Sequence, residues 1–465
     1  MLTLDYANCL STRVGAHGLD PTTLDANAER LTGITRSLNE SRGTGWERWR
    51  ELWNEPMRSE HLNKVSAIAN ECEGRFENIV VLGIGGSALG NIALQSALNS
   101  PVYNMLPAGE RPGPRIFVLD NVDPSNFNAV MGTCDPKTTL FNVISKSGET
   151  AETAAQFMIA RKLLQDAVGS RWADHVVAIT DPEKGTMRTI CDEAGITTLP
   201  VPEGVGGRFS VLSPVGLFSA AVCGIDIEAL LDGAKAMDEL CGRETLKQNP
   251  AAMLATLLVE LGNKGKTNHV LMPYANGLKL LGDWYAQLWA ESLGKKSDTE
   301  GNEVFAGFTP ISALGATDQH SQVQLYREGP NDKVIGFVEV GDFGPDQSLT
   351  VPTGMGVDAI EYLEGKRLAD LLNAEKRATE YALVESQRPN FTIKLPSIDA
   401  HHVGQFIALW EIATAYAGRL LNIDAYDQPA VETGKKATFG LMGREGYGDW
   451  LGKVNETVGE TEFVV

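Results

Sequence analysis

The sequence predicts an α/β protein with two parallel sheets, each covered by helices on both faces, after a helical segment at the N-terminus. Short apolar runs flanked by Gly, Pro, Asp or Asn alternate with longer stretches of helical periodicity, and this alternation occurs twice along the chain. Strands that are apolar throughout are typical of parallel sheets buried on both faces. The length of 465 residues also exceeds that of one ordinary domain, so we expect two.

The first 75 residues repeat apolar side chains at helical spacing without a chemical motif, which predicts a packed helical segment. In the first series we expect strands at residues 79–82, 116–119, 140–144 and 176–179, and helices at 88–98 and 151–164. In the second series we expect strands at residues 269–272, 334–340 and 391–395, and helices at 278–293 and 404–421. The predicted division of the chain is therefore 1–75, 76–225 and 226–465.

Charge and cysteine content exclude several classes of function. The chain has 40 Lys and Arg against 60 Asp and Glu, a formal charge of −20, so nucleic acid and anionic membranes are not expected partners. A small anion can still bind a locally basic cleft. The six cysteines form no Cys-x-x-Cys pair, which argues against a zinc ribbon and a disulfide scaffold. With no secretory signal pattern and no run of 18 apolar residues, we expect a cytoplasmic protein.

The first chemical motif is VVLGIGGSALG, residues 80–90, in which a predicted strand runs through a glycine turn into a helix. Such a turn presents backbone amides and the positive end of a helix to an anion. Its glycines also fit a dinucleotide-binding fingerprint, but the ribose-binding acid expected about 20 residues later is missing. Ser87 at the start of the helix favours a smaller phosphate instead. The alternative is a tight turn that only allows close helix packing.

A second motif, SKSGETAET at residues 145–153, again joins a strand end to a helix. Three hydroxyls, from Ser145, Ser147 and Thr150, surround a glycine where the first amides of a helix have no partners. An ordinary helix cap completed by Glu152 is the simpler interpretation for one hydroxyl. Three hydroxyls beside a glycine-rich partner loop favour a phosphate site.

Two further motifs supply a cation and a carboxylate. In GVGGRFS, residues 204–210, Arg208 follows two glycines that would let a ligand approach the backbone. In QLWAESLGK, residues 287–295, Gln287 and Glu291 lie four apart on one helix face beside apolar side chains, where a carboxylate can act as a general base. Alone, each would more often be a solvated surface residue.

The last two motifs are polar. GATDQHSQ, residues 315–322, places His320 among hydrogen-bonding neighbours, where its ordinary pKa suits acid–base transfer. DQPAVETGK, residues 427–435, contains Gln428, Glu432 and Lys435 after the last long helix. Lysines near a chain end commonly form only a solvated face.

Taken in order, these six motifs resemble those of the glucose-6-phosphate isomerase (phosphoglucose isomerase) family, in its compact bacterial branch. The resemblance extends over residues 83–435. It implies two sugar-isomerase-type domains, a homodimer, and no metal or organic cofactor. It also implies an intramolecular oxidoreductase of glycolysis and gluconeogenesis, which interconverts glucose 6-phosphate and fructose 6-phosphate through ring opening and a cis-enediolate.

The resemblance implies a role for each residue. Glu291 matches the base that moves a proton between C1 and C2, and Arg208 matches the group that stabilises the enediolate. His320 and Lys435 match residues that assist ring opening, with His320 contributed by the neighbouring subunit. The substrate-binding residues are expected to be Ser87, Ser145, Lys146, Ser147, Thr150, Gln287 and Gln428.

The sequence departs from the family pattern at Glu149, where relatives commonly have a second threonine. A carboxylate beside a phosphate is repulsive, so we expect the Glu149 side chain to point away. The doubled lysine at 435–436 is the other departure, and its spacing from Glu432 selects Lys435.

Three other functions remain open on the sequence. The first is a dinucleotide-dependent oxidoreductase, which the missing acid disfavours. The second is a catalytically silent sugar-phosphate sensor, which the presence of Glu291 and Arg208 disfavours. The third is an isomerase that also accepts mannose 6-phosphate, on which the sequence is silent.

Overall fold

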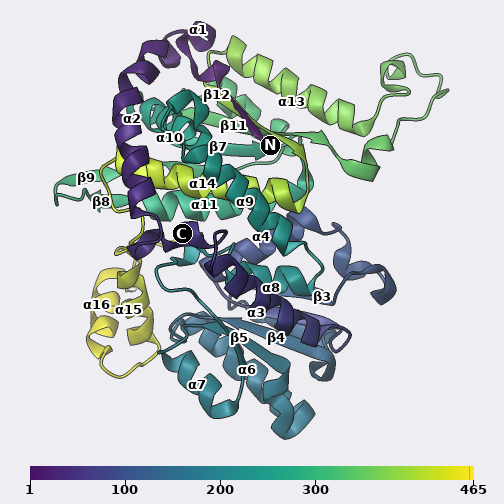
Figure 1. Ribbon diagram of the computed structural model, residues 1–465, viewed down its shortest axis with the longest axis vertical. Coiled ribbons are helices and arrows are strands. Elements are labelled where there is room, and N and C mark those ends of the chain that lie inside the picture. Colours follow the sequence, from purple (N-terminus) through teal and green to yellow (C-terminus); the bar gives the residue numbers. More distant parts are fainter. Residues whose placement is uncertain (460) are drawn as a thin grey trace.

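The computed structural model describes residues 1–459 and 461–465 and contains two five-stranded sheets (Figure 1). The first has the order β3-β2-β4-β5-β6, with all neighbours parallel. Its strands are β2 (Asn78–Leu82), β3 (Arg115–Leu119), β4 (Thr139–Ile144), β5 (Val176–Thr180) and β6 (Thr197–Pro200).

The second sheet has the order β1-β12-β11-β7-β10 and is parallel except at the edge strand β1, which runs antiparallel to β12. Its strands are β1 (Thr3–Asp5), β7 (Asn268–Pro273), β10 (Thr309–Ser312), β11 (Lys333–Asp342) and β12 (Asn390–Ser397). A separate antiparallel hairpin is formed by β8 (Lys295–Ser297) and β9 (Glu303–Ala306). Each strand predicted from an apolar run is confirmed, with ends within two residues of the prediction.

Helices cover both faces of each sheet. On the first sheet, α5 (Pro124–Thr133), α6 (Ala151–Val168) and α7 (Thr186–Ala194) cover one face, and α3 (Met57–Cys72), α4 (Leu89–Leu98) and α8 (Pro214–Val222) cover the other. On the second sheet, α12 (Val323–Glu328) and α13 (Leu368–Glu385) cover the outer face, and α10 (Pro250–Asn263), α11 (Lys279–Leu293) and α14 (Ala400–Leu420) cover the inner face. The expected long helices at 88–98, 151–164, 278–293 and 404–421 are α4, α6, α11 and α14.

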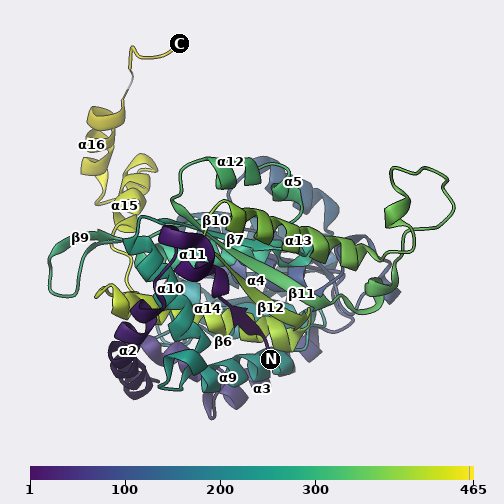
Figure 2. The ribbon, with the colours of Figure 1, turned by 90° about the horizontal axis from the view of Figure 1, so that it is seen from above.

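The remaining helices lie around this body. They are α1 (Ser11–Val14), α2 (Pro21–Ser41), α9 (Ile227–Cys241), α15 (Val431–Leu441) and α16 (Gly448–Val458). The chain between β11 and α13, residues 343–367, projects from the main body of the protein (Figures 1 and 2). Helices α15 and α16 lie beside the main body, away from this projection. No helix among the described residues is both long enough and apolar enough to cross a membrane.

The largest apolar cluster lies between the two sheets. It joins Ile79 and Val81 of β2 to Leu271 of β7 through helical residues such as Trp289 of α11. Val80 and Leu82 point to the other face, against α5, α6 and α7, because successive side chains alternate along a strand. Since one core serves both sheets, the division at residue 225 remains a prediction.

Strand order in the first sheet determines where a ligand can bind. From β2 the chain passes to β3 on one side, and β4 then lies on the other side of β2. In open parallel sheets, ligands bind beyond the carboxyl ends of the strands where the order reverses in this way. In this sheet, that position lies beyond the carboxyl ends of the neighbouring strands β2 and β4.

Candidate active site

Two glycine-containing loops leave the first sheet at this reversal. Leu82 of β2 pairs with Val143 of β4, so the chain after each strand emerges at the same edge. The first loop continues into the short 3-10 helix η4 (Gly85–Ser87), which brings Ser87 to the start of α4. The second, residues 145–150, leads into α6. The structure therefore brings these two predicted anion-binding loops to the same sheet edge.

Hydroxyls of the second loop are organised around backbone amides. The amide of Gly148 donates to Oγ of Ser145 over 3.0 Å, and the amide of Glu149 donates to Oγ of Ser147 over 3.1 Å. Thr150 immediately precedes α6 and makes no side-chain cap. Ser145 is buried, whereas Ser147 is exposed.

Glu149 is directed to other partners. Its carboxylate accepts from Nη2 of Arg444 over 2.8 Å and from the hydroxyl of Thr186 over 3.4 Å. The hydrogen bond from Arg444 lowers the pKa of this carboxyl below its ordinary value. These contacts support the expectation that the Glu149 side chain turns away from the anion.

Close backbone contacts join the first loop to two other motifs. A Cβ on Gly86 would lie 2.3 Å from the carbonyl carbon and oxygen of Gly207, so no larger residue fits there. A Cβ on Gly85, whose φ is +57°, would lie 3.1 Å from Nε2 of Gln287. The glycine turn thus packs against both the loop before Arg208 and the helix before Glu291.

Arg208 is buried, and all parts of its guanidinium have partners. Nε donates to Oγ of Ser292 over 2.7 Å, and Nη1 donates to Oε1 of Gln428 over 2.8 Å. Nη2 donates to the carbonyls of Ala425 and Asp427 over 2.6 and 3.1 Å. A guanidinium held at this many points has little freedom to reorient.

Glu291 approaches this guanidinium from α11. Its Oε1 lies 3.4 Å from Nη1 of Arg208, and its Oε2 accepts from Nε2 of Gln287 over 3.0 Å. Burial lowers the pKa of Arg208, although the charge of Glu291 opposes this effect. Among the described residues, Oε1 of Gln287 is buried without a donor. The structure thus brings Glu291, Arg208, Gln287 and Gln428 together.

Two residues that the sequence analysis did not single out complete this cluster. Ser292 is fully buried and contacts Arg208, and Lys295 donates to the carbonyls of Glu291 and Ser292 over 3.0 and 2.8 Å. Nζ of Lys295 also lies 3.6 Å from Oδ1 of Asp427. Burial, followed by the charge of Arg208, lowers the pKa of this ammonium. Ser292 and Lys295 could have been expected at the site, because both lie within the AESLGK motif that contains Glu291.

A cavity of about 380 Å³ lies beside the cluster, and we call it the loop cavity. It is lined by Trp46, Lys146, Val205, Gly206, Gly207, Tyr426, Asp427, Gln428, Pro429 and Glu432. The loop before Arg208, the loop after β4 and the chain after α14 therefore meet at one space. Trp46 carried no sequence signal. Among the described residues, no group of His, Cys, Asp or Glu is arranged to hold a metal ion.

His320 lies elsewhere in the chain. It follows the short 3-10 helix η12 (Thr317–Gln319) and its side chain is exposed. Within the described part of the chain, no hydrogen bond or ion pair joins it to Arg208 or Glu291. The chain before His320 packs on the start of α11, because a Cβ on Gly282 would lie 2.6 Å from Oγ of Ser312, whereas Glu291 lies in the last turn of that helix.

Lys435 is also not in contact with the Arg208 cluster. It lies on α15, where its ammonium pairs with Glu432 over 2.8 Å, and more than half of its side chain is exposed. In α15 only Gly440 is buried, because the helix packs mainly on α16 rather than on the sheets. Lys435 approaches the loop cavity only through Glu432, which lines it.

The chain is similar to known proteins over most of its length. A model of the family described as phosphoglucose isomerase matches residues 59–442. The chain is 43% identical over 464 residues to the glucose-6-phosphate isomerase of Carboxydothermus hydrogenoformans, covering 100% of this chain and 99% of that protein. It is 41% identical over 452 residues to the glucose-6-phosphate isomerase of Rubrobacter xylanophilus, covering 96% and 99%.

Solved structures show the same fold. A hypothetical protein of Thermus thermophilus superposes with a TM-score of 0.84 at 36% identity, over 95% of this chain and 100% of that one. A glucose-6-phosphate isomerase of Chlamydia trachomatis superposes with a TM-score of 0.78 at 23% identity, over 97% and 93%. The predicted fold class and the predicted isomerase class are confirmed. The chain belongs to the phosphoglucose isomerase family.

Proposed function

We propose that this chain interconverts glucose 6-phosphate and fructose 6-phosphate through ring opening and a cis-enediolate. The observation that carries the proposal is that Oε1 of Glu291 lies 3.4 Å from Nη1 of Arg208. Every nitrogen of this guanidinium also donates a hydrogen bond. Aldose–ketose isomerisation requires a base that removes a proton from one carbon and returns it to its neighbour. It also requires a fixed cation beside the oxygens on which charge develops.

In this reaction Glu291 would move the proton between C1 and C2. Nη1 of Arg208 faces the same space and would stabilise the enediolate oxygens. The bonds from Ser292, Gln428 and two carbonyls fix the guanidinium before the reaction begins, so little reorganisation is needed in the transition state. The free Oε1 of Gln287 is suited to accept a hydrogen bond from a substrate hydroxyl.

The phosphate group would bind between the two loops at the sheet reversal. We assign it to Ser87, Ser145, Lys146, Ser147 and Thr150. Hydroxyls and amides at two helix N-termini converge at that edge, and helix N-termini favour anions. Anchoring the dianion away from the reacting carbons would hold C1 and C2 near Glu291.

We propose that His320 assists ring opening in the site of a neighbouring subunit. The chain eight residues before His320 packs on the start of α11, where a Cβ on Gly282 would lie 2.6 Å from Oγ of Ser312, and Glu291 lies nine residues further along that helix. At 1.5 Å per residue, Gly282 and Glu291 are about 14 Å apart along α11, which favours a role for His320 in the site of a neighbouring subunit. Lys435 would assist at the same step from α15.

A homodimer would supply that second site. The projecting segment 343–367 exposes several large apolar side chains, namely Leu349, Met355, Val357, Ile360 and Tyr362. Exposed apolar side chains gathered on one projection are typical of surfaces that bind another protein. We also propose a cytoplasmic location, which agrees with six buried cysteines that are all free.

The test is a coupled assay that measures glucose 6-phosphate formed from fructose 6-phosphate by the purified chain. We expect turnover in the ordinary range for enzymes, and turnover lower by on the order of 10²-fold or more from the Glu291→Gln variant prepared in parallel. A folded, dimeric wild-type protein without turnover would refute the proposal. The same assay with mannose 6-phosphate determines whether the enzyme also accepts that epimer.

A further inference from the structure

Trp46 is unusual among the eight tryptophans of the chain. Six of them are buried, Trp450 on α16 is partly exposed, and Trp46 is 51% exposed. An indole left in water forgoes the free energy of burial, so an exposed tryptophan beside a cavity is a candidate contact for a ligand.

Trp46 lies beside the candidate active site. It lines the loop cavity together with Gly206, Gly207 and Gln428. Nζ of Lys146, in the loop after β4, lies 5.4 Å from the centroid of its ring. Trp46 and Lys146 also line an adjoining cavity of about 530 Å³. Lys146 is therefore the link between Trp46 and the expected phosphate site.

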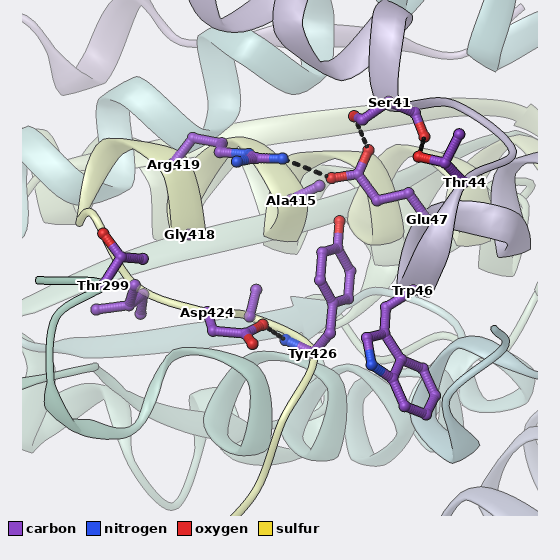
Figure 3. A pocket seen from close by; sticks show the side chains of 12 residues that line it. Ser41, Thr44, Trp46, Glu47, Thr299, Ala415, Gly418, Arg419, Asp424 and Tyr426 are labelled. Carbon is purple, nitrogen blue, oxygen red and sulfur yellow. Dashed lines mark hydrogen bonds and ion pairs between the residues drawn. The ribbon is translucent and has the colours of Figure 1, made fainter.

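Hydrogen bonds and ion pairs of neighbouring residues hold the backbone at Trp46 in place. It belongs to the 3-10 helix η3 (Gly45–Glu51), in which Arg50 donates to Asp238 of α9 over 3.0 Å and to the carbonyl of Leu38 over 2.6 Å. Glu47 accepts from Arg419 over 2.9 Å. In Figure 3 the Glu47 carboxylate points toward Arg419, whereas the Trp46 indole points away from it.

The same 3-10 helix packs directly on the loop that contains Arg208. Trp49 stacks on Phe209 with ring centroids 5.0 Å apart and an interplanar angle of 28°. A Cβ on Gly204 would lie 2.2 Å from the carbonyl oxygen of Gly45, so the two backbones are in contact. The backbone at Trp46 is thus fixed relative to the loop that contains Arg208, as the wall of a ligand site requires.

We propose that Trp46 is a positioning residue for substrate binding, which forms the outer wall of the loop cavity and holds the Lys146 ammonium toward the substrate phosphate. The negative face of an exposed indole attracts a cation, which biases a flexible lysine toward one position. The family match begins at residue 59, so Trp46 lies outside the matched region. This inference rests on the proposed function.

The first test compares Trp46→Ala and Trp46→Phe with wild type in the isomerase assay. We expect Trp46→Ala to raise KM about three- to tenfold while kcat changes less than about twofold, because the contact acts on binding rather than on proton transfer. Trp46→Phe keeps an aromatic face and should restore most of the affinity. The matched control is Trp450→Ala, since Nζ of Lys453 lies 4.8 Å from the centroid of that ring on α16, a helix that itself carries no proposed substrate-binding or catalytic residue.

A double-mutant cycle tests whether Trp46 acts through Lys146. If it does, the KM of Trp46→Ala combined with Lys146→Met should equal that of Lys146→Met alone. Full additivity would overturn the proposed coupling. A lower melting temperature for Trp46→Ala with unchanged KM would reduce Trp46 to a structural residue and also overturn the proposal.

The last measurement separates this inference from the proposed function. Inorganic phosphate is titrated into the protein while tryptophan fluorescence is recorded. We expect a saturable change in the wild type and in Trp450→Phe, and its loss in Trp46→Phe. Isomerase activity without any such change in the wild type would refute the inference alone, whereas the fluorescence change without activity would refute the function alone.

Discussion

Nη1 of Arg208 lies 3.4 Å from Oε1 of Glu291, although one residue follows the first sheet and the other ends a helix of the second. Ser292, which follows Glu291 on the same helix, accepts a hydrogen bond from Nε of Arg208. Arg208 is therefore tied to α11 at two neighbouring residues. Glu291 and Arg208 therefore cannot move independently. A shift of α11 against the loop at 204–210 would displace both.

Replacing Glu291 by Gln should abolish proton transfer with little effect on binding. The amide keeps the size of the side chain and its contact with Gln287 but cannot act as a base. We expect kcat to fall by on the order of 10²–10⁴ or more, while KM stays close to the wild-type value. Steady-state kinetics measure both quantities. Near-normal turnover would show that another group is the base.

Arg208→Lys should reduce turnover more than affinity. A lysine keeps the charge but cannot make bonds to Ser292, Gln428 and two carbonyls at once. We expect kcat to fall about 10²-fold or more, as when a group that stabilises transition-state charge is removed. The buried carbonyls left unpaired should also lower the melting temperature. A loss confined to KM would make Arg208 a binding residue instead.

The sequence predicted the central strands and the motif loops because these have strong local signals. A strand buried on both faces, such as β2, is an uninterrupted apolar run. The edge strands β1, β6 and β10 were not predicted, because they are short and their residues are partly exposed. The positions of β1 and β10 depend on pairing with β12 and β7, which are distant from them in sequence.

The same distinction applies to the site. Glu291, Arg208 and the hydroxyl loops were found through side chains with recognisable chemistry. The carbonyls of Ala425 and Asp427 hold Arg208, but a backbone oxygen has the same chemistry at every position and leaves no trace in the sequence. Trp46 reaches the loop cavity only because η3 packs on the loop before Arg208, a long-range contact that periodicity cannot predict.

Gly86→Ala should damage the site by steric contact alone. The new Cβ would meet the Gly207 carbonyl at 2.3 Å, and the φ of Gly86 is not positive, so no dihedral strain is added. Because Gly207 immediately precedes Arg208, we expect kcat/KM to fall on the order of 10²-fold. Gly33→Ala in α2 is the matched control, since nothing lies within 4 Å of its Cβ position. Equal activity of the two variants would contradict this role for the contact.

Removing the hydroxyls of Ser147 and Thr150 should weaken phosphate binding. The double replacement by Ala leaves the amides of the loop in place but deletes two of its donors. We expect KM to rise much more than kcat falls, because ground and transition states share this contact. Competitive inhibition by inorganic phosphate should weaken by a similar factor. Equal losses in kcat and kcat/KM, with unchanged phosphate inhibition, would place the anion elsewhere.

Activity should require a dimer in which His320 crosses the subunit interface. Glu291→Gln and His320→Ala subunits should each be inactive, but a mixed dimer places both defects in one site and leaves the other intact. Random reassociation makes about half of the dimers mixed, so about a quarter of the wild-type site activity should return. Subunit exchange is verified separately with a tagged subunit. If exchange occurs and the mixture stays inactive, His320 acts within its own chain or has no part in the reaction.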